Sequence, residues 1–304
     1  MIYIAVGVLL LYFGAESLVR GSSRLAAYFG IPPLIIGLTV VAFGTSAPEL
    51  TVSISAAFKG AADVAIGNVV GSNIFNIAVI LGITALIRPP SVHLDLIRRE
   101  IPFLILVSVL GFCLVSYGEV SRLVGMGLFT ILCGYIFFSI RAARGQGEEV
   151  GVVEPGFSVW MCILLIFAGL GILVLGSNLF VRGAVVMARE FGISEAVIGL
   201  TIVAAGTSLP ELATSVVAAF KKESDVAIGN IVGSNIFNIL CILGLTASIQ
   251  PIEVGGIGIR DAAFMLGLSI LLLPFAFTKR SISRGEGCVF LSIYGVYLFL
   301  LWPR

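Results

Sequence analysis

The chain contains one long segment twice, and this duplication constrains its fold more than any other feature of the sequence. Residues 37–85 recur as residues 199–247 at a constant offset of 162, and 35 of the 49 aligned positions are identical. The identities concentrate in two motifs with polar residues, GTSxPEL and DVAIGNxVGSNIFNI. Side chains that only face lipid need to be apolar, so polar residues kept in both copies indicate a duplicated site.

The composition places this duplication in a membrane. Of the 304 residues, 59% are hydrophobic and 12% are charged, and the mean hydropathy is +1.13. These values exclude a soluble domain and make the lipid bilayer the surroundings of the chain. The net charge of +1, without a basic run, argues against a nucleic-acid partner.

Apolar runs long enough to span a bilayer predict an all-α membrane protein with ten transmembrane helices. They fall into two groups of five: 2–27, 31–58, 63–87, 99–117 and 122–141, then 157–186, 193–220, 225–249, 261–278 and 285–302. We therefore expect a first five-helix repeat over 1–142, a short linker over 143–155 and a second five-helix repeat over 156–304.

Because five is an odd number, the second repeat must enter the membrane with the opposite orientation. The result is an inverted 5+5 repeat, an arrangement that places transport sites at the membrane midplane. Twelve Lys and Arg residues lie on the side of the linker and six on the other side. The positive-inside rule then predicts a multi-pass protein of the cell membrane with a cytoplasmic linker and both termini outside.

The first motif places a carboxylate inside a predicted span. Glu49 is costly there unless it faces a cavity, a partner or an ion. Pro48 has no N–H for the carbonyl of Gly44, so the helix should bend and leave backbone oxygens without helical partners. Thr45 and Ser46 add hydroxyl oxygens one helical turn away from Glu49.

The second motif adds Ser72 and Asn76, which are four residues apart and share one helix face. The second repeat supplies the same groups again: Thr207, Ser208, Pro210, Glu211, Ser234 and Asn238. Carboxylate, hydroxyl, amide and carbonyl oxygens without Cys or His suit calcium or sodium, and they do not suit zinc, copper or iron–sulfur clusters. We expect these ions to be the transported partners, with no organic cofactor.

The first helix of each half also repeats, since FGAESLVRGS at 13–22 matches LGSNLFVRGA at 175–184 with the same offset. Glu16 corresponds to Asn178, so its charge is not needed in both halves. The last two helices of each half are expected to show no such similarity. We therefore predict that helices 1 and 6 move, while helices 4, 5, 9 and 10 form a scaffold.

These motifs resemble a known family. GTSAPEL with GSNIFNI, and GTSLPEL with GSNIFNI, are similar to the two α-repeats of the cation/calcium exchanger superfamily, in its sodium/calcium exchanger branch. The short linker resembles that of prokaryotic members. The resemblance implies a secondary antiporter that exchanges calcium for sodium by alternating access to a midplane site, and no enzymatic activity.

The resemblance also implies roles for individual residues. Calcium would bind Glu49 and Glu211 with oxygens of Thr45 and Thr207. The sodium sites would add Ser46, Ser72, Ser208 and Ser234 with the carbonyls of Ala42 and Ala204, and the midplane polar pair would be Asn76 and Asn238. Many relatives carry Asp at the position of Asn238, which leaves the charge of the site and its response to protons open.

Two other functions remain alternatives at this stage. A proton-driven exchanger of calcium or another divalent cation could use the same two glutamates. A cation channel fits less well, because channels usually build their filters from rings of subunits or loops. An intramembrane enzyme would need a nucleophile with a base, or a metal-binding motif, and the single histidine, His93, rules out most of these. We expect a monomer.

Overall fold

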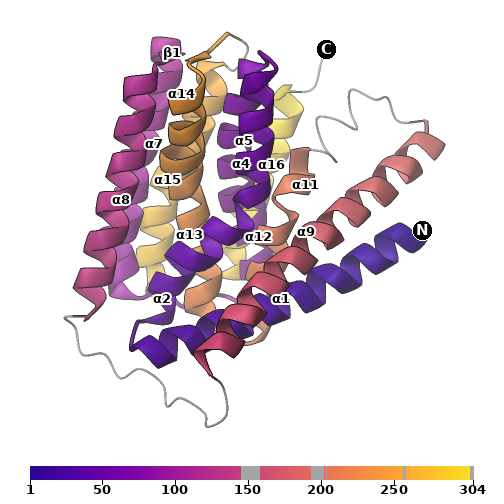
Figure 1. The fold of residues 1–304 in the computed structure, drawn as a ribbon, viewed down its shortest axis with the longest axis vertical. Coiled ribbons are helices and arrows are strands. Elements are labelled where there is room, and N and C mark those ends of the chain that lie inside the picture. The colour runs from indigo at the N-terminus through magenta and orange to yellow at the C-terminus, as the bar shows by residue number, and fades with distance from the viewer. Residues whose placement is uncertain (145–157, 193–201, 203, 256–257, 302–304) are drawn as a thin grey trace.

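The structure is a computed structural model of the chain, and it describes residues 1–144, 158–192, 202, 204–255 and 258–301. It is a bundle of helices in which short π-helical segments, among them η1, η2, η3 and η5, interrupt longer α-helices (Figure 1). The first half comprises α1 (Ile2–Phe29), α2 (Pro33–Ile36), η1 (Gly37–Val41), α3 (Ala42–Thr45), α4 (Ala47–Phe58), α5 (Ala62–Phe75), η2 (Asn76–Leu81), α6 (Gly82–Ile87), η3 (Leu96–Glu100), α7 (Ile101–Tyr117), β1 (Glu119–Val120) and α8 (Arg122–Arg144). The second half comprises α9 (Val159–Glu190), α11 (Ala204–Thr207), α12 (Leu209–Phe220), α13 (Ser224–Phe237), η5 (Asn238–Leu243), α14 (Gly244–Ile249), β2 (Ile252–Glu253), α15 (Ile259–Phe277), the 3₁₀ turn η6 (Thr278–Arg280) and α16 (Arg284–Leu301).

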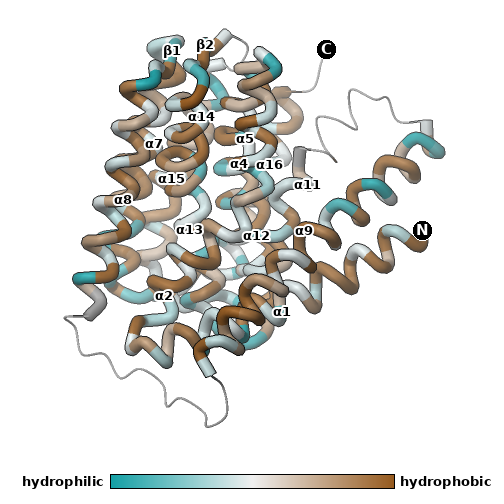
Figure 2. The backbone as a smooth tube through the Cα atoms, viewed as in Figure 1, coloured by the Kyte–Doolittle hydropathy of each residue, from teal (hydrophilic) through white to brown (hydrophobic). Residues whose placement is uncertain are grey.

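The described helices confirm a multi-pass membrane protein. Eight of them are long and apolar enough to cross a membrane, and the pair Pro33–Thr45 and Ala47–Phe58, bent by 44°, provides a ninth crossing. The tenth predicted span, 193–220, begins outside the described residues and continues as α11 and α12. Figure 2 shows hydrophobic residues along most of α7 and α8, as lipid-facing helices require.

The predicted linker at 143–155 lies almost wholly outside the described residues. Its first two positions belong to α8, which continues to Arg144. The described part of the second half begins with Ser158, whose hydroxyl caps α9 by accepting a hydrogen bond from the N–H of Met161.

Helices α1 and α9 lie side by side, run in opposite directions and cross the rest of the bundle obliquely (Figure 1). Glycines bring the two backbones together, because a Cβ atom added at Gly14 would lie 2.8 Å from the backbone nitrogen of Leu173. Three glycines at seven-residue spacing in each helix make this contact, and the two sets differ by the offset of 162: Gly7, Gly14 and Gly21 with Gly169, Gly176 and Gly183. The two helices therefore form one closely packed pair.

Short strand contacts between the two halves show the inverted symmetry directly. Glu119 pairs with Glu253 in the antiparallel sheet of β1 and β2, and Ser91 forms an antiparallel bridge with Ser281. Adding 162 to 91 and to 119 gives 253 and 281. The two contacts are therefore the same contact with the repeats exchanged, as a two-fold axis between the halves requires.

The expectation that the last two helices of each half lack internal similarity is wrong. Residues of α7 and its preceding turn recur in α15 at an offset of 161, and residues of α8 recur in α16 at 162. The matched pairs are Arg99 and Arg260, Glu100 and Asp261, Phe103 and Phe264, Ser108 and Ser269, Gly125 and Gly287, Ile131 and Ile293, and Tyr135 and Tyr297. The one-residue change of offset hides this similarity, while the structure pairs Ser108 with Ser269 at 2.9 Å.

The two halves nevertheless differ in how α1 and α9, the oblique pair, contact the rest of the bundle. Helix α1 packs along α12, whereas α9 makes no comparable contact with α4 in the part of the chain that the structure describes. The N-terminal end of α1 and the C-terminal end of α9 stand away from the bundle (Figure 1). The sequence gives Glu16 no clear role. In the structure its Oε1 lies 2.7 Å from Nζ of Lys221, which follows α12, and the two side chains form an ion pair.

Candidate ion-binding site

The two GTSxPEL motifs form helix breaks at the centre of the bundle. Helix α3 ends at Thr45, Ser46 has φ −82° and ψ 5°, and α4 restarts at Ala47 with the bend of 44°. Because Pro48 cannot donate a backbone hydrogen bond, the break falls where the sequence predicts it. Ser208, with φ −88° and ψ 7°, makes the same break between α11 and α12.

Each glutamate is held by a serine of the other repeat. The Ser46 hydroxyl donates to Oε1 of Glu211 at 2.9 Å, and the Ser208 hydroxyl donates to Oε1 of Glu49 at 2.9 Å. Both carboxylates are 1% exposed, and they lie close enough to repel each other. The two breaks therefore meet face to face and form one site from two half-sites.

Asparagines of the second motif fix the backbone of the glutamates. The Asn68 amide donates to the Glu49 carbonyl at 3.0 Å and to the Ser53 hydroxyl at 2.9 Å. Asn230 donates in the same way to the carbonyl of Glu211 at 3.3 Å. These hydrogen bonds place α4 on α5 and α12 on α13, which orients each carboxylate before any ion binds.

The other predicted residues of the second motif lie on buried helix faces. Asn76 begins η2 and Asn238 begins η5, and single π-helical turns frequently occur at functional sites. Ser72 lies one turn before Asn76, and its hydroxyl oxygen is 3.3 Å from that of Ser208. Ser234 precedes Asn238 in the same way and is fully buried.

Thr45 and Thr207 flank the carboxylates crosswise. Thr207 lies beside Glu49, and Thr45 lies beside Glu211. The Thr45 hydroxyl is also 3.1 Å from Oδ1 of Asn230. Thr45 is buried, whereas Thr207 is partly exposed, so the site is less covered on the side of Thr207.

The backbone carbonyls predicted as ligands have different surroundings. The Ala42 carbonyl accepts from the N–H of Ser46 at 3.0 Å and lies 3.3 Å from the Thr45 hydroxyl. The backbone hydrogen bond therefore uses one lone pair of the Ala42 carbonyl oxygen. Ala204 begins α11.

Several buried oxygens at the centre have no hydrogen-bond partner among the described residues. They are Oε2 of Glu49, Oε2 of Glu211, Oδ1 of Asn76, Oδ1 of Asn238 and Oγ of Ser234. Buried polar atoms are almost always paired, so a group of orphaned oxygens needs a missing partner. A hard cation is the partner that carboxylate, amide and hydroxyl oxygens bind in common.

Comparison with known proteins agrees with this geometry. The family described as sodium/calcium exchanger protein matches residues 1–141 and 161–302. The chain belongs to the sodium/calcium exchanger family. It is 41% identical to inner membrane protein YrbG of Escherichia coli strain K12 over 98% of this chain and 93% of that protein, and 33% identical to sodium/calcium exchanger MaX1 of Methanosarcina acetivorans over 97% and 96%.

Solved structures of the sodium-calcium exchanger NCX_Mj are similar over almost the whole chain. One of them superimposes with a TM-score of 0.87 at 33% identity and covers 99% of this chain and 98% of that chain. This exchanger family is one of transporters, and the helical membrane fold predicted from the sequence is confirmed.

In this sodium/calcium exchanger the sequence interpretation missed one group next to the site. Pro210 cannot donate to the carbonyl of Gly206, and the hydroxyl of Ser177 on α9 donates to that carbonyl instead at 2.6 Å. The equivalent of Ser177 in the first half is Ala15, which has no hydroxyl. This difference was visible within the aligned first helices, but only the structure shows what the hydroxyl contacts.

Within the described residues, no cluster of three or more His, Cys, Asp or Glu side chains is placed to hold a metal ion. The central site of this exchanger has two carboxylates, and its other oxygens are neutral. Such a site offers a bound cation less negative charge than a site for a permanently bound metal usually does. Weaker binding of this kind allows a transported ion to be released.

Proposed function

We propose that this protein is a secondary antiporter that exchanges calcium for sodium across the membrane. The reciprocal pairing of Ser46 with Glu211 and of Ser208 with Glu49 carries the proposal, because it makes one buried site from two inverted half-sites. MaX1 and NCX_Mj, to which the chain is similar, are both named as sodium/calcium exchangers, and this supports the choice of ions.

The transported ions are held by oxygen atoms of both repeats. Glu49 and Glu211 bind calcium, because their free oxygens supply the negative charge that repays its dehydration. The remaining proposed ligands of calcium or sodium are Thr45, Thr207, Ser46, Ser208, Ser72, Ser234, Asn76, Asn238 and the carbonyls of Ala42 and Ala204.

Access to this site alternates because the oblique pair slides past the bundle. The contact of α1 with α12, without a comparable contact of α9 with α4, supports this proposal. If each repeat adopted the arrangement of the other, these helix contacts would also be exchanged. The protein would then be in a second state in which α9 packs on α4. We infer that the open side in the present state is the one where the N-terminal end of α1 stands away from the bundle (Figure 1).

The surroundings of the chain complete the proposal. The protein lies in the cell membrane as a monomer, with both termini outside and residues 143–155 as a cytoplasmic linker between repeats 1–142 and 156–304. The excess of Lys and Arg on the linker side supports this orientation.

Uptake of radioactive calcium into proteoliposomes tests the function. A sodium gradient directed outward should drive calcium uptake that saturates with calcium concentration, and the Glu49→Gln variant should show none. Uptake driven only by a proton gradient would replace this proposal with the proton-driven alternative. Calcium flux without either gradient, and without saturation, would indicate a channel.

A further inference from the structure

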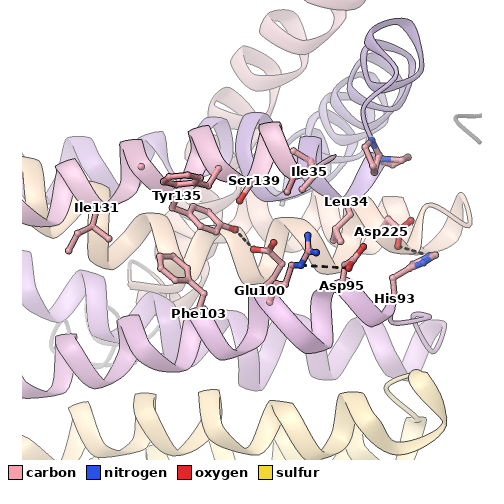
Figure 3. Close-up of a pocket in the computed structure, with 16 residues that line it drawn as sticks. Leu34, Ile35, His93, Asp95, Glu100, Phe103, Ile131, Tyr135, Ser139 and Asp225 are labelled. Atoms are coloured by element: carbon pink, nitrogen blue, oxygen red, sulfur yellow. Dashed lines mark hydrogen bonds and ion pairs between the residues drawn. The ribbon is translucent and has the colours of Figure 1, made fainter. Parts of the chain in front are cut away.

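A cavity of about 690 Å³ lies apart from the ion-binding site and contains none of its proposed ligands. It opens between the start of α2, the junction of η3 with α7, and the second half of α8 (Figure 3). Asp225, in the first turn of α13, also lines it. An occupant would therefore touch both α2 and α13, and these two helices lead to the ion-binding segments of opposite repeats.

The lining of this cavity changes from charged to apolar along its length. His93, Asp95 and Asp225 lie at one end, and Phe103 and Ile131 lie at the other (Figure 3). The charged end coincides with the ends of the membrane-spanning helices, and the apolar end lies deeper along α7 and α8. A molecule with a polar head at the membrane surface and an apolar chain inside the bilayer matches this gradient.

The middle of the cavity is built around a pair of side chains, the buried Glu100 and the partly buried Tyr135. The Tyr135 hydroxyl donates to Oε2 of Glu100 at 2.5 Å, and the Tyr135 ring stacks on Phe103 with centroids 4.5 Å apart. Arg99 extends beside this pair, with its Nε 3.9 Å from Oδ1 of Asp95. The aromatic stack gives a flat apolar wall next to the Glu100 carboxylate.

The same arrangement occurs at the opposite membrane surface. The Tyr297 hydroxyl donates to Oδ1 of Asp261 at 3.0 Å, and the Tyr297 ring lies 5.1 Å from that of Phe264. A second cavity of about 430 Å³ is lined by Arg260, Phe264 and Ile293. These residues correspond to Arg99, Phe103 and Ile131 of the first cavity, so equivalent side chains line the two cavities.

We propose that the cavity between α7 and α8 binds one phospholipid whose headgroup carries a primary ammonium. Its phosphate lies against Arg99, its ammonium lies between Asp95 and Asp225, and one acyl chain follows Phe103 and Ile131. A primary ammonium donates hydrogen bonds to both carboxylates, which a quaternary choline nitrogen cannot do.

The second cavity supplies an internal comparison. Among the residues that the structure describes, its lining contains Arg260 but no carboxylate, so we expect it to hold a phospholipid phosphate without selecting the ammonium. Headgroup selectivity therefore belongs to the first cavity alone, and the two sites can be separated by variants.

Native mass spectrometry of the delipidated full chain tests the proposal. The probes are phosphatidylethanolamine, phosphatidylcholine and phosphatidylglycerol with identical acyl chains. The first lipid bound should prefer ethanolamine over choline by about 1.4- to fivefold, the range expected for partly exposed ion pairs. Asp95→Asn together with Asp225→Asn should remove this preference, and Arg99→Gln should weaken the binding of all three lipids.

Two variants serve as controls. Glu253→Gln removes an exposed carboxylate at the other surface and should leave the preference unchanged. Arg260→Gln should remove a second bound lipid without changing the headgroup preference of the first. Calcium binding equal to that of the wild type shows that each variant is folded.

Equal binding of ethanolamine and choline lipids to the wild type would overturn the proposal. So would a preference that survives in the variant lacking both Asp95 and Asp225 carboxylates. If phosphatidylglycerol bound more tightly than phosphatidylethanolamine, Arg99 would recruit an anionic lipid. This result would also overturn the assignment of the ammonium site.

Discussion

The ion pair between Glu16 and Lys221 should bias the protein toward one of its two access states. It joins α1 to the loop after α12 at 2.7 Å, on the side where the two helices are in contact. The positions related by the offset of 162 are Asn178 and Lys59, which form no ion pair because asparagine is neutral. Inversion of the structure would therefore lose this contact without replacing it.

The size of the bias follows from the exposure of the two side chains. Lys221 and Glu16 are 35% and 30% exposed, so water screens their attraction. Pairs of this kind contribute about 0.2 to 1 kcal/mol, which corresponds to a roughly 1.4- to fivefold change in a population ratio. Lys221→Met should increase the population of the opposite state by this factor, and Asn178→Glu should do the same by creating a pair with Lys59.

Distances between spin labels would measure these populations. Labels at Tyr3→Cys on α1 and Phe58→Cys on α4, two exposed positions, report the separation on the open side. In a background without the five native cysteines, Lys221→Met should raise the fraction of short distances. Lys59→Met is the matched control and should change little. Unchanged distances in Lys221→Met, or equal effects of both variants, would refute the reasoning.

Three further outcomes are expected. Glu49→Gln and Glu211→Gln should each abolish sodium-driven calcium uptake while the protein still inserts and elutes normally, whereas near-normal uptake would mean that the site lies elsewhere. Asn238→Asp adds a third carboxylate near the glutamates, so acid inhibition of calcium binding should begin at higher pH than in the wild type, and superimposed titration curves would contradict this placement. Gly14→Ala forces a methyl group against the backbone of Leu173, which should cost about 1 to 3 kcal/mol in thermal unfolding, and an unchanged melting temperature would show that α1 and α9 adjust freely.

Much of the fold could be predicted from the sequence because bilayer physics leaves few choices. A run of apolar residues must form a helix in lipid, so hydropathy alone indicates the spans. The odd number of spans in each half then dictates inversion. The break at Ser46 was equally predictable, since Pro48 removes a backbone donor at a fixed position.

The chemistry of the site also followed from residue types, but its connectivity did not. The motifs name Glu49 and Ser46 as neighbours in sequence, whereas the structure pairs Ser46 with Glu211 of the other repeat. Which half-site faces which depends on how α4 and α12 approach each other, and no local pattern encodes that approach. The ligand roles of the predicted residues stay predictions.

The sequence by itself determined the membrane class, the two inverted repeats and the oxygen-rich set of polar residues, because each depends on residue type and spacing alone. Only the tertiary structure decided that Glu16 meets Lys221, that Tyr135 and Tyr297 build equivalent clusters, and that α1 packs on the bundle more closely than α9 does. Near-identical repeats have near-identical local preferences, so their difference in packing arises from contacts between distant segments, where a few unequal side chains select one of two related arrangements.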